Sequence, residues 1–259
     1  MVLVNVLLSI LLRAAMIDPS NFYTGLVAEL YEPLAGGISD SDRFIEFVEK
    51  HGEPALEICC GTGLPMLDLL EAGLDVEGID ASKDMLEICE ANATKRGISV
   101  TLHHAKMQNF KMLKRFRSIY IANGSITLLP SDDDLRQTFS AILNCLDPSG
   151  VVLFDLDVPK VDNLRRHIGK FKETQSEGSL IRVGMTRVDW REDDSELIMK
   201  LRYERISESG EVESVERDWF RKVWSVDRFC ELLVDSGFHI SGVESLDSGV
   251  IQVCAEVAA

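Results

Sequence analysis

The fold of this chain is decided by a short apolar run that ends in a glycine turn, Ala55-Leu56-Glu57-Ile58-Cys59-Cys60-Gly61-Thr62-Gly63. The run predicts a buried strand, and the apolar spacing of residues 64–71 predicts a helix directly after the turn. In an open parallel sheet, ligands bind at the carboxyl ends of the strands, and the first strand-to-helix turn comes closest to them. Because Gly61 and Gly63 carry no Cβ atom, valine at either position is expected to block a ligand while the fold survives.

The sequence on both sides of this turn repeats the alternation of strands and helices. Expected strands span residues 55–59, 76–79, 100–104, 118–122, 151–156, 238–243 and 250–257, and expected helices span residues 20–31, 40–50, 64–71, 83–95, 132–146 and 227–236. Short apolar strands between helices require crossover connections, so the sheet is expected to be mostly parallel and covered on both faces. The predicted fold class is α/β, a Rossmann-like, doubly wound, mostly parallel seven-stranded sheet with an inserted antiparallel β-meander.

The inserted meander is predicted from a change of pattern after residue 159. Helical periodicity disappears, and three β-like runs follow at residues 180–190, 197–206 and 212–224. In the middle run every second residue from Leu197 to Tyr203 is apolar or aromatic, which is the period of a half-buried antiparallel strand. The predicted domains are a helical cap over residues 1–50, a sheet domain over residues 51–159 and 223–259, and the meander over residues 160–222.

The composition is that of a globular chain with a strongly acidic balance. The 259 residues contain 43 acidic and 27 basic side chains, which gives a formal net charge of −16. Nonspecific nucleic-acid binding is excluded as a default function because it requires a surplus of Lys and Arg. The six cysteines and five histidines lack the spacing of zinc ligands or of a disulfide framework, so we predict no metal site and a cytoplasmic location.

The apolar start of the chain, residues 1–16, is too short to span a membrane and lacks the features of a signal peptide, so no stable membrane insertion is predicted. Polar residues at every fourth position, Asn5, Ser9 and Arg13, predict a helix with one narrow polar stripe. The sequence leaves several interpretations open: a packing helix, a functional start at Met16, a lid over a ligand, or a contact with a membrane surface.

Asp80 is the main candidate for binding a nucleoside. It lies 17 residues after Gly63, at the end of the second expected strand, where a carboxylate can accept hydrogen bonds from two ribose hydroxyls. The alternative interpretation is a helix cap, but Ser82 is the better cap candidate. Dinucleotide sites require a third small residue where this chain has Met66, so a cofactor with a ribose and no phosphates is favoured.

These motifs together resemble the class I S-adenosylmethionine-dependent methyltransferases, in particular the small-molecule branch with amino-sugar and glycine N-methyltransferases. Residues 56–63 look like the family's first motif, and residues 78–86 look like its second. Residues 146–153 are similar to the approach to the fifth strand, and residues 224–238 are similar to the last helix and its Gly-Phe turn. The resemblance covers nearly the whole chain after Met16.

The resemblance implies a set of residues that bind S-adenosyl-L-methionine. Glu57, Gly61 and Gly63 would line its methionine part, Asp80 would hold the ribose, and Met85 would pack on the adenine. Further implied contacts are Tyr23, Cys59, Ala81, Lys106, Met107, Ala122 and Asn123. Lys106 replaces the aspartate that accepts from the adenine amino group in the family, and an ammonium cannot accept a hydrogen bond, so adenine would be read by the backbone at Met107.

The residues that carry the reaction are less sharply indicated. Residues 122–129 resemble the segment between sulfonium and acceptor, with Leu128 where several relatives have a histidine or an aromatic residue. His104, Tyr31 and Asn123 are the catalytic candidates. Tyr23 and Tyr31 are expected as lid residues, or alternatively as one face of an amphipathic helix.

The acceptor site is predicted from the third run of the meander. Trp219 and Arg221 share one face there by alternation. They could form a flat wall and a fork for a carboxylate or phosphate, which favours a small acidic acceptor. The alternative interpretation is that Arg221 is paired with a neighbouring acidic residue.

The predicted function is transfer of a methyl group from S-adenosylmethionine to a nitrogen or oxygen of a small-molecule metabolite, with the meander and N-terminal helices closing over the acceptor. An amine needs only its lone pair, whereas a hydroxyl needs a base nearby. A catalytically silent, methyltransferase-like protein that binds a partner is the alternative, and a nicotinamide-dependent oxidoreductase is disfavoured by Met66. The sequence predicts no nucleic-acid partner and leaves a homodimer open.

Overall fold

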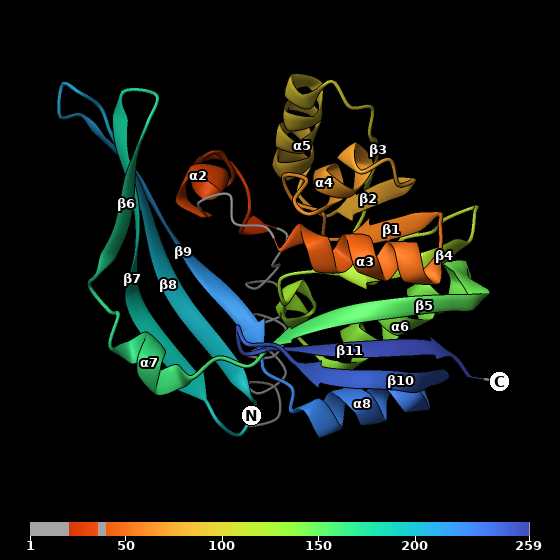
Figure 1. Cartoon of the computed structure of the whole chain (residues 1–259). Helices are drawn as coiled ribbons and strands as arrows, with labels where there is room; N and C mark the ends of the chain where they lie inside the picture. Colours follow the sequence, from red (N-terminus) through yellow and green to blue (C-terminus); the bar gives the residue numbers. More distant parts are fainter. Residues whose placement is uncertain (1–20, 36–39, 259) are drawn as a thin grey trace, which may run out of the picture.

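The computed structural model describes residues 21–35 and 40–258, which form two β-sheets (Figure 1). The larger sheet has seven strands in the order β10-β11-β5-β4-β1-β2-β3. Its strands are β1 (Ala55–Ile58), β2 (Val76–Asp80), β3 (Thr101–His104), β4 (Phe116–Ile121), β5 (Leu146–Asp157), β10 (Phe238–Ser245) and β11 (Val250–Val257). All neighbours are parallel except β11, which runs antiparallel to β5 and β10.

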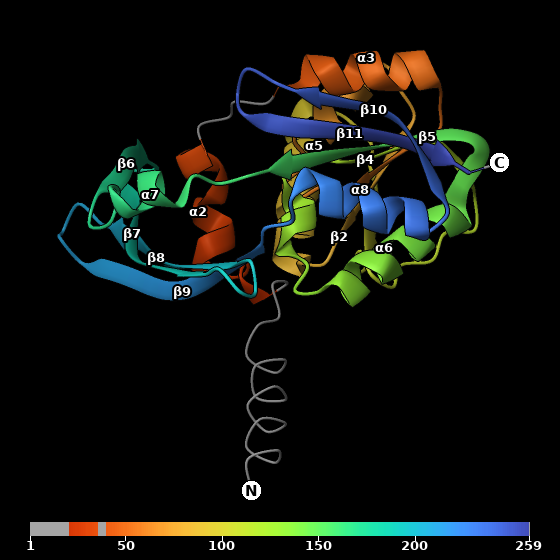
Figure 2. The same ribbon diagram turned by 90° about the horizontal axis from the view of Figure 1, so that it is seen from below.

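Helices cover both faces of this sheet, because its central strands are apolar on both sides. The helices are α3 (Ser41–His51), α4 (Met66–Glu71), α5 (Lys83–Arg96), α6 (Asp132–Cys145) and α8 (Val226–Asp235). Figure 2 shows α3 on one side of the sheet and α6 and α8 on the other. In β1, Leu56 and Ile58 pack in the core with α6 and α8, whereas Ala55 packs in the core with α3, α4 and α5. The predicted doubly wound, seven-stranded α/β fold is confirmed.

The smaller sheet has four antiparallel strands, one more than the three predicted runs. They are β6 (Phe171–Ser176), β7 (Ser179–Arg191), β8 (Glu196–Ile206) and β9 (Val212–Lys222), and a short helix, α7 (Val161–Arg165), precedes them. β6 is an edge strand of mostly polar residues without an alternating pattern, so periodicity could not reveal it. The last run ends at Lys222 rather than at Trp224, whose side chain is buried in the core of the larger sheet.

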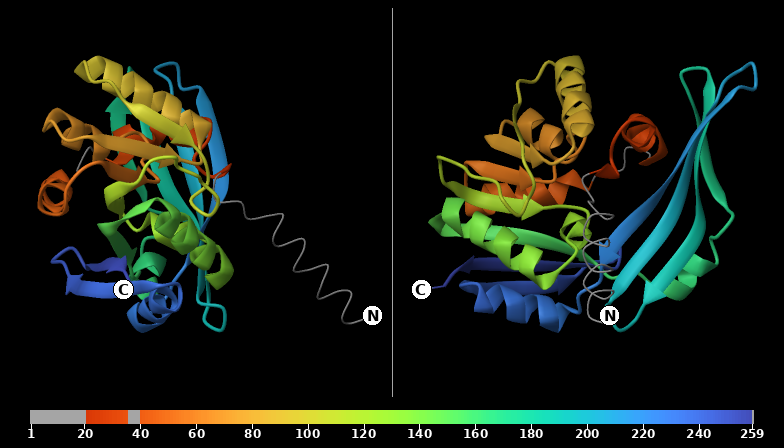
Figure 3. Two further views of the ribbon diagram at one scale, coloured as in Figure 1. Left: turned by 90° about the vertical axis from the view of Figure 1, so that its right-hand side faces the viewer. Right: turned by 180° about the vertical axis from the view of Figure 1, so that it is seen from behind.

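The first described helix, α2 (Leu26–Ala35), packs on the smaller sheet, whereas α3 packs on the larger one. Phe22, Leu26 and Leu30 form a cluster there with Ile181 and Tyr203. Figure 3 shows the smaller sheet and α2 standing beside the edge at which β5 ends. The two helices predicted as one N-terminal cap therefore lie on different layers.

Some predicted bounds shift. The helix expected from Ser20 to Tyr31 spans Leu26–Ala35, and the one expected to begin at Leu64 begins at Met66. Ser20 and the apolar start at residues 1–16 lie outside the described residues. Within residues 21–35 and 40–258, no helix is long and apolar enough to cross a membrane.

Candidate functional site

Two adjoining cavities lie at the carboxyl edge of the parallel strands, beneath α2 and the smaller sheet. The larger cavity has a volume of about 330 Å³, and the smaller one has a volume of about 100 Å³. Both are lined by residues of the glycine turn, of the segment before α2 and of the turn after β4. The shared residues are Tyr23, Tyr31, Cys59, Gly61, Ser125 and Leu128. One molecule could therefore occupy both cavities across the glycine turn.

Asp80 holds the glycine turn and faces the smaller cavity. Its Oδ2 accepts a hydrogen bond from the Gly61 N–H at 2.9 Å, and its Oδ1 accepts one from the Ser82 N–H at 2.8 Å. Burial raises the pKa of the Asp80 carboxyl, and these backbone donors oppose that rise. Ser82 is the cap of α5, since its hydroxyl accepts from the Met85 N–H at 3.2 Å. Asp80 is thus left to hold the turn and line the cavity.

The two glycines of the turn have different surroundings. A Cβ on Gly61 would meet only the Met85 Cε, at 3.4 Å, and Gly61 lines both cavities. A Cβ on Gly63 would lie 2.7 Å from Leu67 side-chain atoms and 2.9 Å from the Cys89 sulfur. Gly63 lines neither cavity within the described residues, and the space beside its Cα is filled by the packing beneath the turn.

Most of the residues predicted to bind the adenosine part line the smaller cavity. They are Asp80, Ala81, Met85, Lys106 and Met107. Lys106 therefore places an ammonium group, a hydrogen-bond donor, in the cavity where the resemblance implied an aspartate acceptor. The prediction missed Ser82, Gln108, Ser125 and Leu129, which also line it. Ser82 lies in the second motif and Ser125 and Leu129 lie in the segment after the fourth strand, but the motifs do not show which of their side chains face the cavity.

Two predicted cofactor residues lie behind the cavity wall. Ala122 is buried, and Glu57 is 1% exposed beneath the turn. Burial raises the pKa of the Glu57 carboxyl well above its usual range, and a hydrogen bond from the Tyr120 hydroxyl at 3.0 Å opposes that rise. The structure gives both residues a place in the support of the turn, and neither lines the described cavities.

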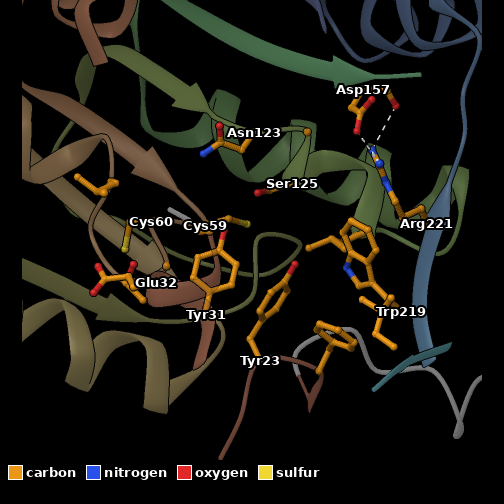
Figure 4. A pocket seen from close by; sticks show the side chains of 18 of the residues that line it. Tyr23, Tyr31, Glu32, Cys59, Cys60, Asn123, Ser125, Asp157, Trp219 and Arg221 are labelled. Carbon is orange, nitrogen blue, oxygen red and sulfur yellow. Dashed lines mark hydrogen bonds and ion pairs between the residues drawn. The ribbon is translucent and has the colours of Figure 1, made fainter. Parts of the chain in front are cut away.

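Aromatic side chains form one wall of the larger cavity (Figure 4). Tyr23 and Tyr31 stand edge to face, with ring centroids 5.7 Å apart. Phe22 lies between Tyr23 and Trp219, with centroid distances of 4.9 Å and 6.2 Å. Tyr203 of β8 completes the wall. Phe22 and Tyr203 were missed by the sequence analysis, because only the packing of α2 against β8 brings them to the cavity.

The segment that carries Phe22 and Tyr23 is tied to both sheets. The Ser82 hydroxyl donates to the Tyr23 carbonyl oxygen at 2.5 Å, and the Gly25 N–H donates to Asp84 Oδ2 at 2.6 Å. From β9, the Arg217 guanidinium donates to the Phe22 carbonyl oxygen at 2.8 Å. These bonds fix the aromatic wall over the glycine turn.

Arg221 is paired with an acidic residue and does not form a free anion fork. Its Nη1 donates to Asp157 Oδ2 at 2.6 Å, its Nη2 donates to the Asp157 carbonyl oxygen at 3.2 Å, and its Nε donates to the Thr127 hydroxyl at 2.9 Å. Dashed lines mark the contacts with Asp157 in Figure 4. The alternative interpretation from the sequence, an arginine paired within the protein, is the one that the structure bears out.

The three catalytic candidates are not brought together. Tyr31 and Asn123 line the larger cavity, whereas His104 lines neither cavity of the described chain and its Nε2 lies 3.0 Å from the Ala81 carbonyl oxygen. Burial raises the pKa of Tyr31, with nearby Asp80 adding to the rise, so its hydroxyl keeps its proton at neutral pH. Asn123 has a φ of 56°, and its N–H donates to Asp155 Oδ2 at 2.9 Å. No strong general base therefore stands among these three.

A second carboxylate lies at the far end of the glycine turn. Glu32 lines the larger cavity, and its Oε1 accepts a hydrogen bond from the Asn92 amide at 2.7 Å. The same amide donates to the Thr62 carbonyl oxygen at 3.1 Å, which ties α2 to the turn. Within the part of the chain that the structure describes, no group of three or more His, Cys, Asp or Glu side chains could hold a metal ion.

A family model described as a methyltransferase domain matches residues 55–150. These residues are therefore similar to a methyltransferase domain. The match spans the glycine turn and Asp80, and it ends as β5 enters the sheet. The resemblance to methyltransferases that the motifs indicated is confirmed.

Two similar proteins match about half of the chain. A dTDP-3-amino-3,6-dideoxy-alpha-D-glucopyranose N,N-dimethyltransferase from Streptomyces fradiae is 29% identical over 55% of this chain and 57% of its own length. A glycine/sarcosine N-methyltransferase from Aphanothece halophytica is 32% identical over 49% of this chain and 49% of its own. The chain thus spans about half the length of the curated relatives that it matches.

The fold is shared over a longer stretch. An S-adenosylmethionine-dependent methyltransferase from Clostridium acetobutylicum superposes with a TM-score of 0.71, covering 90% of this chain and 98% of its own at 17% identity. At this identity the likeness shows the fold alone.

Proposed function

We propose that the chain is an S-adenosyl-L-methionine-dependent methyltransferase that transfers a methyl group to a nitrogen or oxygen atom of a small molecule. The observation that carries this proposal is the pair of cavities that adjoin at the glycine turn, one beside Asp80 and one behind the aromatic wall. A methyltransferase needs such a pair, because donor and acceptor must meet end to end. The relatives named as sugar and amino-acid N-methyltransferases support nitrogen as the acceptor atom.

The residues of the two cavities fit the cofactor. Asp80 offers a carboxylate for ribose hydroxyls, and Met85 and Met107 offer soft apolar contacts for a purine. Glu32, at the opposite end of the turn, offers a carboxylate for the α-ammonium group of a methionine chain. When bound, the cofactor supplies a methyl group on a positively charged sulfur that leaves as a neutral thioether.

The chain's own contribution to the reaction is positioning. The aromatic wall and the glycine turn exclude water from the site. They hold the acceptor next to Cys59 and Gly61, where the two cavities meet. Proper orientation of two reactants can supply about 7–11 kcal/mol of the barrier, so a site without a strong base can still be effective for an amine. Burial raises the pKa of the Cys59 thiol well above its usual range, which keeps this nearby nucleophile protonated.

Removing the Asp80 carboxylate is expected to lower the affinity for S-adenosylhomocysteine by about 1.5–3 kcal/mol, because ribose acceptors and the hydrogen bond that holds the Gly61 N–H are lost together. Titration calorimetry of Asp80→Ala measures this loss, and a circular dichroism spectrum checks that the variant is folded. The matched control is Glu87→Ala on α5, whose carboxylate lies at the surface in an ion pair with Lys83 at 3.5 Å. An unchanged affinity in folded Asp80→Ala would refute the ribose assignment.

One comparison separates the competing functions. A rise in melting temperature with S-adenosylmethionine and S-adenosylhomocysteine, and none with NAD, supports the proposal by mass action. Stabilisation by NAD instead would favour an oxidoreductase. Cofactor binding without transfer to any of a panel of amines and hydroxyl compounds would favour the catalytically silent alternative. A homodimer and a cytoplasmic location stay predictions, which gel filtration and cell fractionation test.

A further inference from the structure

We infer that the acceptor is a cationic amine without a carboxylate or phosphate group, and that Asp157 attracts its ammonium group into the larger cavity. This inference rests on the proposed function and specifies its substrate class. It reverses the expectation of a small acidic acceptor drawn from Trp219 and Arg221.

The charges in the larger cavity carry the argument. Among its described lining residues, the acidic and basic side chains are Glu32, Asp157 and Arg221. Arg221 already donates three hydrogen bonds to Asp157 and Thr127. An anionic acceptor would have to displace these bonds, whereas a cationic acceptor meets the Asp157 carboxylate, since Glu32 is assigned to the α-ammonium group of the cofactor.

The Arg221–Asp157 pair presents its negative member to the cavity. The side chain of Asp157 is 45% exposed, whereas that of Arg221 is 5% exposed. Figure 4 shows Asp157 at the end of β5, opposite the tyrosines. Arg221 therefore acts as a buried positioning residue that holds the carboxylate in place, and Asp157 is the group that an incoming molecule meets.

The aromatic wall suits the same ligand. Ring faces attract ammonium groups within about 6 Å of the ring centre, and the attraction grows when the site excludes water. Trp219 already accommodates one cation in this way, since the Arg221 guanidinium carbon lies 5.3 Å from its ring centroid. Tyr23, Tyr31 and Tyr203 extend this wall around the cavity. Burial raises the pKa of the Tyr203 hydroxyl beyond its usual range, so it adds no negative charge of its own.

These charges favour an acceptor different from those for which the relatives are named. Glycine carries a carboxylate, and a dTDP-sugar carries a diphosphate, so sites for these molecules need a free cation or well-aimed donors. The larger cavity of the described chain has no Lys or Arg besides the paired Arg221. Lys106 lies in the smaller cavity, on the side of Asp80.

The reaction balances for such an amine. The bound ammonium first loses one proton to water, and the Asp157 carboxylate, which is the exposed member of its pair with Arg221, accepts this proton and passes it on. The nitrogen lone pair then forms a bond to the methyl carbon, and the carbon–sulfur bond breaks with its electron pair on sulfur. The products are a thioether and a methylated ammonium, which the carboxylate and the aromatic wall also stabilise.

The test measures binding of three probes of one shape and different charge to the protein saturated with S-adenosylhomocysteine. Choline is the cation, 3,3-dimethylbutan-1-ol is its neutral counterpart, and 3,3-dimethylbutanoate is the anion. Calorimetry is expected to show that choline binds at least about tenfold more tightly than the neutral alcohol, which is the effect of one moderate charge interaction. The anion is expected not to bind. Equal binding of choline and the alcohol, or tighter binding of the anion, would overturn the inference.

Two variants assign the effect to residues. Asp157→Asn is expected to weaken choline binding at least about tenfold and to leave the affinity for S-adenosylhomocysteine unchanged. Asp157→Asn also leaves Arg221 without its ion pair, so a second variant that keeps this pair is needed. Tyr203→Leu is expected to weaken choline binding about threefold or more. The control is Glu216→Gln, an exposed carboxylate on the same strand as Arg221.

The outcomes separate the two proposals. If S-adenosylhomocysteine itself fails to bind, the proposed function falls. If it binds and choline shows no preference over its neutral counterpart, only the substrate class falls. Choline binding that survives in both Asp157→Asn and Tyr203→Leu would likewise refute the site assigned here.

Discussion

Replacing Arg43 with methionine is expected to lower the free energy of unfolding by about 3–5 kcal/mol, the usual result of removing one partner from a buried ion pair. Arg43 of α3 holds Asp155 of β5 with two hydrogen bonds, Nη1 to Oδ1 at 2.8 Å and Nη2 to Oδ2 at 2.7 Å. The Asp155 side chain is 0% exposed and that of Arg43 is 18% exposed, so methionine would leave a carboxylate without a counter-charge inside the protein. Urea titration followed by circular dichroism measures the loss.

A matched surface pair provides the control. Arg165 and Asp162 lie 3.3 Å apart with side-chain exposures of 50% and 87%, so Arg165→Met is expected to change stability by less than about 1 kcal/mol. Asp155 also accepts the N–H of Asn123, which lines the larger cavity. Arg43→Met should therefore weaken acceptor binding in the fraction that stays folded. A loss of stability no larger than that of the control would show that the ion pair with Arg43 does not stabilise the native protein.

The sequence indicated the larger sheet well because its signals are local. The buried strands β1, β2 and β4 are short apolar runs, as at residues 55–58, and the next helix along the chain, α4, α5 or α6, has its own periodicity. The edge strand β6 carries no such signal, since a strand with one open edge and little burial tolerates Lys172 and Glu173. Its place in the smaller sheet depends on pairing with β7, which no property of residues 171–176 alone indicates.

The cofactor side of the site was likewise predictable, and the acceptor side was not. Gly61 follows the first strand and Asp80 ends the second strand, so their places relative to these apolar runs identify them in the sequence. The larger cavity gathers Tyr203, Asp157 and Glu32 from three distant segments. Arg221 shows the limit most clearly. Alternation placed it on one face with Trp219, and both side chains line the larger cavity. Its partner, Asp157, lies 64 residues earlier in the chain, so the sequence could not decide between an anion fork and an internal ion pair.

The last prediction separates two glycines that look equivalent in the sequence. Gly61 and Gly63 both have positive φ angles, 53° and 106°, so valine at either position is strained. Only at Gly63 does the added Cβ overlap core atoms, those of Leu67 and Cys89. Overpacking of this kind adds about 1–3 kcal/mol, so Gly63→Val is expected to be less stable than Gly61→Val by that amount. The expectation that valine at Gly63 spares the fold is thereby revised.

Binding should follow the opposite order among molecules that remain folded. Gly61→Val fills space shared by both cavities, so the affinity for S-adenosylhomocysteine is expected to fall at least about a hundredfold, equivalent to about 2.7 kcal/mol. Gly63→Val, measured at a temperature where it is folded, should lose less, because its side chain points away from both cavities. Urea titration and calorimetry on the same two preparations decide the matter. Equal stability of the two variants would contradict the overlap at Gly63. Tighter binding by Gly61→Val than by Gly63→Val would mean that the turn approaches its ligand through Gly63.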